Sequence, residues 1–322
     1  MKKQALIIIS SANELPLNNP TKQKIDTRFF LVEMGKILDT FKDDYEFIFA
    51  TPNGEKPTLD INGESLSMQA GEKLGIASVK EKFYKDPTNY RQKNTKLVDR
   101  REKELNTLYD LLGKLPVSQN LSNTDEETKE FRKQIVRKMD DLEEKKFYSL
   151  KELLENNADN NNDFSFENLS FVHLPGGHAP MVDFLDNPEL GEVLNQLSEQ
   201  KVITSLICHA PIALTSARLR IDDKGKPYNY DKSLYEGAHI TTVPKIGELF
   251  MLISGYPKIK NKKTRLHYYV DKKLISYNFN VKTTKNFTKS LVVYDKTRKL
   301  LTGNGPQAID DQTDKLKEIL PK

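Results

Sequence analysis

Cys208 is the only cysteine in the chain, and it lies where a nucleophile would be expected. A short apolar, β-branched run at 202–207 predicts a buried parallel strand, and the small and apolar residues from Pro211 onward predict a helix. Cys208 therefore falls at a strand-to-helix turn, the position of a nucleophile elbow. The positive end of the following helix favours a thiolate. We expect a reactive thiol here rather than a buried structural one.

A reactive thiol needs donors for a developing oxyanion and a base that is held in place. His209 follows Cys208 directly, but neighbouring side chains leave a helix start in different directions. We therefore expect the backbone N–H of His209, rather than its ring, to lie beside the thiol. The turn at 175–178, Pro-Gly-Gly-His, ends another apolar run, and its glycines allow the backbone to approach a ligand closely. Both turns follow the carboxyl ends of strands, where open parallel sheets bind ligands.

Two glutamates are candidates for the carboxylate of such a site. Glu33 lies within an apolar stretch at 29–34, and it is either a buried acid or an exposed helix position. Glu248 begins a helix after a strand end, and it either orients His209 or is a first-turn glutamate favoured by the helix dipole. If Glu33 is buried, desolvation favours its protonated form, which can donate a hydrogen bond to sulfur and stabilise the thiolate. Rapid alkylation of Cys208 near neutral pH would follow.

Five separated segments carry a resemblance to a known family. They are Phe-Leu-Val-Glu (30–33), Leu-Pro-Gly-Gly-His (174–178), Ile-Cys-His-Ala-Pro (207–211), Ile-Thr-Thr-Val-Pro-Lys-Ile-Gly-Glu (240–248) and Arg-Lys-Leu-Leu-Thr-Gly-Asn-Gly-Pro (298–306). With these motifs the chain resembles the ThiJ/PfpI superfamily of class I glutamine amidotransferase-like proteins. The match is to its branch of heat-shock chaperones with glutathione-independent glyoxalase (glyoxalase III) activity, and it spans roughly residues 1–60 and 165–320.

The resemblance implies a role for each residue of the site. Cys208 would be the nucleophile, His209 its neighbour in a triad, and Glu248 the carboxylate that orients the histidine. Glu33 would be the buried acid that is hydrogen-bonded to the thiol.

The resemblance also implies an oxyanion and substrate-binding region. The amides of Gly177 and His209 would hold the oxyanion, with Gly176 and His178 beside the substrate. The chain departs from the family in having Ala179 and Ala210 where glycine is usual, which adds two methyl groups near the pocket. Some relatives bind a metal through two histidines and a carboxylate. We find no such set among the five histidines, so we predict neither a metal nor a cofactor.

The activity that the resemblance implies is conversion of methylglyoxal to lactate through a hemithioacetal on Cys208. Glu33 and His209 would move the protons, and stress-related protein protection would accompany this activity. One alternative is a holdase chaperone with little or no catalytic activity, and another is a cysteine peptidase or amidase with the same triad. The expected partners are a small reactive carbonyl substrate, unfolded or glycated protein clients, and a second copy in a homodimer.

The predicted fold is an α/β flavodoxin-like sandwich, with a mostly parallel sheet between helices. Residues 1–80 and 165–322 would form this domain. The expected strands are 4–10, 45–50, 169–174, 202–207 and 239–243 with a hairpin at 290–302, and the expected helices are 26–41 with Asp26 as N-cap, 188–200, 246–254 and 306–319. A polar loop would connect the first strand to the first helix.

Residues 81–164 differ from the rest and predict an inserted helical hairpin. The stretch 81–160 holds 17 Lys and Arg and 17 Asp and Glu, and its leucines recur at helical spacing on both sides of a polar segment at 116–125. This insertion is either a lid or partner-binding arm, or a solvated hairpin on the sheet edge.

Composition limits the remaining possibilities. A chain of 322 residues with 37% hydrophobic content can bury a large core. A single cysteine rules out an internal disulfide and suits a reducing compartment. The 50 basic and 46 acidic residues are interleaved, which does not favour nucleic-acid binding. The apolar run at 5–9 is too short for a secretory signal, and no stretch approaches the ~20 residues of a membrane span. We expect a cytoplasmic protein.

Overall fold

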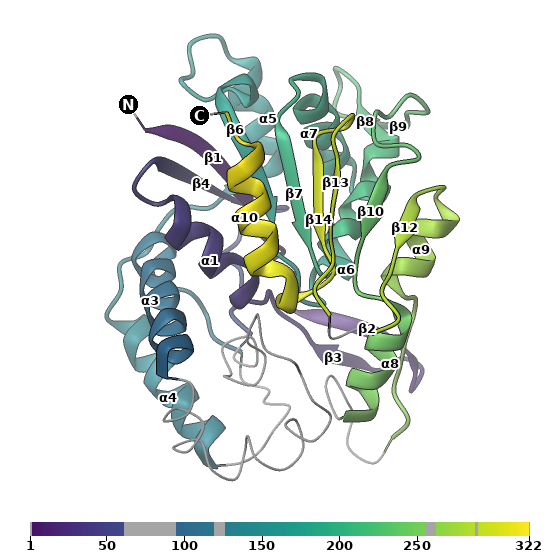
Figure 1. Ribbon diagram of the computed structural model, residues 1–322. Coiled ribbons are helices and arrows are strands. Elements are labelled where there is room, and N and C mark those ends of the chain that lie inside the picture. The colour runs from purple at the N-terminus through teal and green to yellow at the C-terminus, as the bar shows by residue number, and fades with distance from the viewer. Residues whose placement is uncertain (1, 61–94, 119–125, 255–261, 287–288, 322) are drawn as a thin grey trace.

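A seven-stranded sheet forms the centre of the molecule (Figure 1). The computed structural model describes residues 2–60, 95–118, 126–254, 262–286 and 289–321. Along the chain the strands of this sheet are β1 (Lys3–Ile8), β4 (Tyr45–Thr51), β5 (Tyr148–Ser149), β6 (Leu169–Leu174), β7 (Ile203–Ile207), β13 (Val292–Asp295) and β14 (Leu300–Gly303). Their order is β13-β14-β7-β6-β1-β4-β5, and every neighbouring pair is parallel except β13 with β14. The α/β class predicted from the sequence is therefore confirmed.

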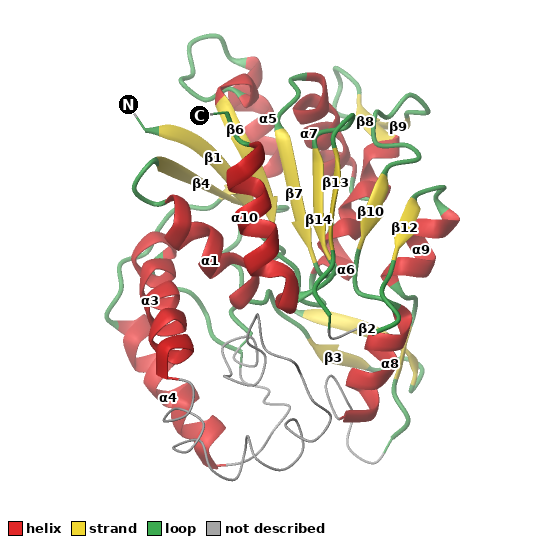
Figure 2. Ribbon diagram, viewed as in Figure 1, coloured by secondary structure: helices red, strands yellow, loops and turns green. Residues whose placement is uncertain are grey.

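Helices cover both faces of this sheet (Figure 2). On one face lie α1 (Val32–Phe41), α3 (Thr95–Leu112), α4 (Glu126–Asp140) and α10 (Ile309–Ile319); on the other lie α5 (Leu150–Ala158), α6 (Pro180–Asp183), α7 (Pro188–Glu199) and the 3-10 helix η5 (Ala210–Arg218). Strand alternation creates two cores, because Ala5 and Ile7 of β1 pack toward α1 while Leu6 and Ile8 pack toward α7. A parallel sheet buried on both faces explains the continuous apolar runs in its strands.

Smaller elements complete the fold around the main sheet. They are β2 (Glu14–Asn19), β3 (Lys24–Asp26) and β11 (Arg265–Leu266) in a three-stranded sheet, β10 (His239–Thr241) with β12 (Asn280–Lys282), β8 (Leu219–Ile221) with β9 (Pro227–Asn229), the helices α8 (Lys245–Ser254) and α9 (Val270–Ser276), and the 3-10 helices η4 (Phe166–Asn168) and η6 (Pro306–Ala308). The expected strand at 239–243 thus lies outside the main sheet.

The segment between β1 and α1 differs from the prediction. A polar loop was expected there, but residues 14–26 form the hairpin β2–β3, in which Leu15 and Leu17 are buried at the period of two that a strand requires. The predicted N-cap Asp26 belongs to β3. Helix α1 begins only at Val32, without a side-chain cap.

Within the predicted insertion at 81–164, the described residues form three helices, α3, α4 and α5, where two were expected; residues 61–94 and 119–125 lie outside the described part. Leu108 and Leu112 of α3 are fully buried in the core beside α1. The division into domains stays a prediction, but β5 pairs with β4 as the last strand of the main sheet and α5 packs against α7, so residues 148–158 of the predicted insertion join the main sheet and its helical layer. Ser149 caps α5 with a capping box, so the chain re-enters the α/β domain there.

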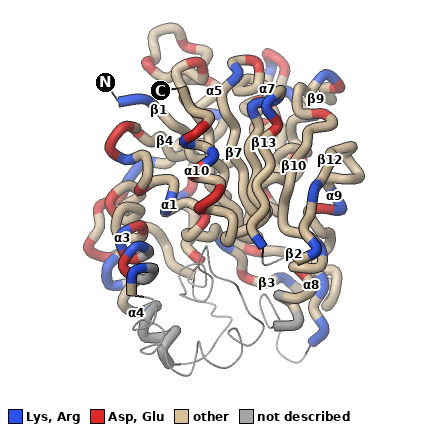
Figure 3. Tube along the Cα trace, in the orientation of Figure 1, with Lys and Arg blue, Asp and Glu red and all other residues tan. Residues whose placement is uncertain are grey.

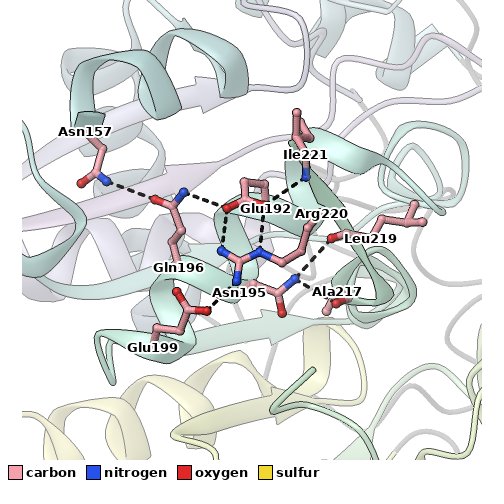
Figure 4. Close-up of polar contacts among 9 residues, drawn as sticks. All are labelled: Asn157, Glu192, Asn195, Gln196, Glu199, Ala217, Leu219, Arg220 and Ile221. Atoms are coloured by element: carbon pink, nitrogen blue, oxygen red, sulfur yellow. Dashed lines mark hydrogen bonds and ion pairs between the residues drawn. The ribbon is translucent and has the colours of Figure 1, made fainter. Parts of the chain in front are cut away.

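A polar network joins α7 to β8 (Figure 4). The Arg220 guanidinium donates from Nε and a terminal nitrogen to the two oxygens of Glu192, at 3.0 and 2.7 Å, and the Ile221 N–H donates to Glu192 at 3.2 Å. Asn195 donates to the carbonyl of Leu219 at 3.2 Å. Two-pronged Arg–carboxylate pairing is among the strongest polar contacts in proteins, so this network holds the β8–β9 hairpin on the α7 side of the sheet.

No helix in the described part of the chain is both long enough and apolar enough to cross a membrane.

Candidate active site

The carboxyl ends of the strands bring four distant segments together. Cys208 follows β7 directly, and the turn at 175–178 follows the neighbouring strand β6. Glu33 lies in the first turn of α1, and Glu248 lies in the first turn of α8. Their contacts, given below, join these segments into one buried site. These four segments are far apart in the sequence, and the order of the strands in the sheet brings them close together.

Cys208 occupies a strained turn. Its φ is +61°, a left-handed conformation that residues with a side chain rarely adopt. Its N–H donates to the carbonyl of Gly303 at 2.9 Å, and its carbonyl accepts from the Thr242 hydroxyl at 2.5 Å. These contacts fix the backbone in the shape expected of a nucleophile elbow. The helix that follows is of the 3-10 type.

The thiol is the first member of a buried hydrogen-bonded chain. Cys208 Sγ lies 3.1 Å from Nδ1 of His209, and Nε2 of His209 hydrogen-bonds with Oε1 of Glu248. The expectation that only the backbone of His209 would face the thiol is therefore wrong. The left-handed backbone of Cys208 turns the two neighbouring side chains toward one another. Cys208 is 5% exposed, His209 2% and Glu248 1%.

A second histidine shares the same carboxylate. Nε2 of His178 donates to Oε2 of Glu248 at 3.0 Å, and the His178 and His209 rings lie with their centroids 4.2 Å apart. An ionised carboxylate can only accept hydrogen bonds, so both Nε2 atoms carry their protons. Nδ1 of a neutral His209 is then unprotonated and faces the thiol, which is the tautomer required of a base.

The pKa of each of these three groups is shifted from its ordinary value. Burial raises the pKa of Glu248, but the two histidines outweigh it and hold that pKa well below its usual range. Burial lowers the pKa of His178, but the charge and hydrogen bond of Glu248, together with the charges of Asp60 and Glu33, outweigh it, so the net shift is upward. Burial and the neighbouring His178 charge lower the pKa of His209 despite the same carboxylate. At neutral pH, His209 is therefore the neutral member of the pair.

Glu33 is a fully buried acid. Its Oε2 accepts the N–H of Gly176 at 2.8 Å, and a Cβ on Gly176 would lie 2.7 Å from this oxygen and 2.6 Å from Cβ of Cys208, so the acid lies beside the cysteine. Burial raises the pKa of Glu33 to about 7, although contacts with Cys208, Gly176 and Gly177 oppose the shift. The choice between a buried and an exposed Glu33 is thereby resolved in favour of burial.

The thiol itself is not the acidic one expected. Burial, followed by the charge of the Glu33 carboxylate and their hydrogen bond, raises the pKa of Cys208 well above its ordinary value. The Gly177 N–H acts in the opposite direction. The cysteine is therefore a thiol at rest, and its proton must be removed when a substrate arrives.

The backbone amides of Gly176 and Gly177 have different roles in the site. Gly176 donates its N–H to Glu33, so this amide is already used and is not free for an oxyanion. A Cβ on Gly176 would lie 2.6 Å from Cβ of Cys208, which explains why a glycine is needed there. Gly177 has φ +90°, and its N–H acts to lower the pKa values of both the Cys208 thiol and the Glu33 carboxyl, which places this amide near the reacting centre.

Two further residues support the site and were missed by the sequence analysis. His173 of β6 is fully buried, contacts the Glu33 carbonyl through Nε2 at 2.9 Å, and has a pKa lowered to about 4 by burial. Asp183 of α6 accepts from the Ser10 hydroxyl at 2.5 Å and from the Ser11 N–H at 2.9 Å, which fixes the loop after β1. The only sequence signal for His173 was a histidine inside an apolar strand.

The two departures from the family pattern do not disturb the backbone. Ala179 and Ala210 are both fully buried, Ala179 has φ −55°, and Ala210 is not among the residues with positive φ. An added methyl group is thus compatible with either turn.

The donor types of His178, His209 and Glu248 would suit a metal ion, and their ligand atoms lie within 4.8 Å of one another. The meeting of these three residues was not predicted from the sequence. However, both Nε2 atoms and both carboxylate oxygens are used in hydrogen bonds among the three residues. A metal would have to replace these bonds, so we derive no step through one. The absence of a metal stays a prediction.

Known proteins resemble this chain in fold rather than in sequence. No protein-family model matches the chain, and no curated protein matches it significantly. The rapid encystment protein of 24 kDa from Francisella tularensis aligns over 100% of both chains with a TM-score of 0.55 at 14% identity. Glyoxalase III from Candida albicans aligns over 98% of this chain and 97% of its own, with a TM-score of 0.50 and 14% identity. Full-length likeness at such identities establishes the fold.

Proposed function

We propose that the protein is a glutathione-independent glyoxalase that converts methylglyoxal to lactate. The observation that carries the proposal is the pairing of a single buried thiol with two neighbouring proton-transfer groups. His209 Nδ1 lies 3.1 Å from Cys208 Sγ, and Glu33 is buried against the same side chain. The motif resemblance and the likeness in fold to a glyoxalase III support the assignment.

The first step forms a carbon–sulfur bond. His209 Nδ1 takes the proton of the Cys208 thiol as sulfur adds to the aldehyde carbon of methylglyoxal. The carbonyl oxygen becomes an oxyanion beside the Gly177 N–H and is protonated to give a hemithioacetal. A thiol with a raised pKa suits this step, because the proton leaves only when an electrophile is present.

The second stage moves hydrogen between neighbouring carbons. A base removes the C–H proton of the hemithioacetal carbon to give an enediol, and a proton returned to the adjacent carbon gives a lactoyl thioester on Cys208. Glu33 is suited to both transfers because its pKa of about 7 lets it accept and donate protons near neutral pH. Water then cleaves the thioester and releases lactate and the thiol, so the reaction needs no external oxidant or reductant.

A cysteine peptidase or amidase is the second candidate, and the observed contact between ring and thiol favours it more than the sequence did. Thiol, imidazole and carboxylate form the linear chain that such enzymes use. Burial argues against it, because Cys208 is 5% exposed and a polypeptide needs open access. Small dicarbonyls can enter where a peptide cannot.

Lactate formation from methylglyoxal without glutathione tests the proposal. We expect the wild type to form lactate and Cys208→Ser to form none above the uncatalysed rate. Release of ammonia or amine from amide substrates by the wild type, without lactate formation, would instead establish the hydrolase. Equal lactate formation by the wild type and Cys208→Ser would end the glyoxalase assignment.

A further inference from the structure

We propose that His178 is a positioning residue that occupies one oxygen of Glu248 and thereby keeps His209 neutral, as the base for Cys208. This inference concerns the same site and rests on the proposed function for its catalytic meaning. Its test reads the state of the thiol directly, so it can fail or succeed independently of lactate formation.

The first argument is geometric. Glu248 has two oxygens, and each is bound by a different imidazole: Oε1 by His209 and Oε2 by His178 at 3.0 Å. A carboxylate that faces a single buried histidine stabilises the imidazolium form of that histidine. When two imidazoles share it, the carboxylate can balance only one positive charge in this dry site.

The second argument decides which histidine carries that charge. His178 contacts the Glu248 carboxylate of α8 directly, and the charges of Asp60, before the undescribed segment, and Glu33 of α1 also favour its protonated form. His209 faces Glu248 and Cys208, but it also faces His178, whose ring centroid lies 4.2 Å away. Like charges at this separation repel, so a charged His178 disfavours a second charge on His209.

The consequence concerns the thiol. With His209 neutral, its Nε2–H donates to Glu248 and its Nδ1 accepts from Cys208, so the resting pair is thiol and imidazole. Without His178, the whole Glu248 charge would act on His209 and would favour imidazolium. A thiolate would then be stabilised beside it before any substrate is bound.

The experiment compares the pH dependence of Cys208 alkylation by iodoacetamide in the full-length wild type, His178→Gln and His178→Phe. Glutamine can still donate a hydrogen bond to Glu248 but cannot carry charge, and phenylalanine can do neither. His239→Gln is the control, because His239 is exposed on β10. Since a charge within a few ångströms shifts a pKa by roughly one unit or more, we expect both His178 variants to react about tenfold faster below the wild-type inflection.

Two outcomes would overturn the proposal. One is an unchanged inflection pH in both His178 variants, with the fold confirmed by circular dichroism. The other is a uniform fall in rate at all pH values, which a purely structural role would produce. Should both variants fail to fold, imidazole ¹⁵N chemical shifts of the wild type decide the matter. We expect His178 to remain protonated to a higher pH than His209, and the reverse order would refute the assignment.

If the protein is not a glyoxalase, lactate formation and the alkylation profiles give different results. The wild type would then form no lactate, while the alkylation profiles would still separate the His178 variants from the wild type. If the wild type forms lactate, His178→Gln should lower kcat and move its pH profile toward acid, with a smaller change in KM. An unaltered kcat profile would contradict the positioning role.

Discussion

The carboxyl group of Glu33 accepts a hydrogen bond at 2.8 Å from the backbone N–H of Gly176, although 143 positions separate the two residues. This contact joins the first turn of α1 to the turn after β6, and it holds the acid against Cys208. The glycine is essential to it, since a Cβ on Gly176 would lie 2.7 Å from Oε2 of Glu33. One backbone amide thus aims the acid at the thiol.

Replacement of Glu33 should separate proton transfer from structure. Glu33→Gln keeps an acceptor for the Gly176 N–H, so we expect the fold to survive while lactate formation falls by about 10²–10⁴-fold, the usual value of a positioned acid or base. Glu33→Ala leaves that buried N–H without its partner, which should cost a further 1–3 kcal/mol or so of unfolding free energy. Steady-state kinetics and urea unfolding measure the two effects.

Glu318→Gln is the matched control, because Glu318 lies on the exposed side of α10, where it pairs with Lys315. Neither activity nor stability should change in it. Wild-type turnover in Glu33→Gln would show that Glu33 does not carry the proton.

The pH dependence of stability should report on the buried acid. The folded-state pKa of Glu33 is about 7, above its ordinary value of 4.5, so the folded state binds this proton more tightly than the unfolded state does. Its contribution is therefore complete below pH 4.5 and is lost as pH rises toward 7. Relative to the wild type, Glu33→Gln should gain roughly 2–3 kcal/mol between these limits.

The comparison of two proteins at each pH matters because His173 titrates in the same range. Its pKa is lowered to about 4, so it destabilises the fold as pH falls below its ordinary value of 6.5. That effect is common to both proteins and cancels in the difference. A difference in unfolding free energy that is flat from pH 4.5 to 7 would mean that Glu33 titrates normally.

Sequence patterns predicted the sheet well because apolar runs report burial directly. The strand at 169–174 and the helix at 188–200 appear almost unchanged as β6 and α7. The hairpin β2–β3 was missed because Pro16 and several asparagines conceal the alternation of Leu15 and Leu17. The polar residues of this segment predicted a loop, and the strand can be recognised only from its pairing in the folded protein.

Within the site, residue identity was predictable but orientation was not. The motifs placed Cys208, His209, Glu248 and Glu33 among the candidates, and the structure brings them together. The ring contact between Cys208 and His209 depends on a φ of +61°, which no pattern of residue types encodes. The second imidazole on Glu248 likewise depends on how β6 and α8 meet in space.

Gly176→Ala should disrupt the site from within the backbone. The new methyl group would lie 2.6 Å from Cβ of Cys208 and 2.7 Å from the carbonyl oxygen of Ile207, so the elbow must move. Overpacking of this kind typically costs about 1–3 kcal/mol, and we expect lactate formation to be lost. Gly35→Ala is the control, because its Cβ would lie 3.4 Å from Glu104 in ordinary contact. Differential scanning calorimetry should show Gly176→Ala alone melting earlier; equal melting temperatures would contradict the close approach.

Arg220→Ala should lower stability without changing the chemistry. The side chain of Glu192 is 10% exposed and depends on Arg220 for two hydrogen bonds, so its removal leaves a largely buried carboxylate and should cost about 1–3 kcal/mol at pH 7. None of the residues drawn in Figure 4 belongs to the site, so kcat and KM should be unchanged.

The sign of the pH effect gives this prediction a second test. Burial raises the pKa of Glu192, but its hydrogen bonds with Arg220 and other donors lower it overall. Its contribution to stability is therefore present above the ordinary pKa of a glutamate and is lost as pH falls through the depressed value. The deficit of Arg220→Ala relative to the wild type should be full at pH 7 and should shrink in acid, when urea unfolding is repeated down to pH 3. Lys224→Ala, an exposed position in the β8–β9 turn, should match the wild type throughout. A deficit that is independent of pH would assign the loss to the contact of the Arg220 guanidinium with the Tyr230 ring rather than to the ion pair.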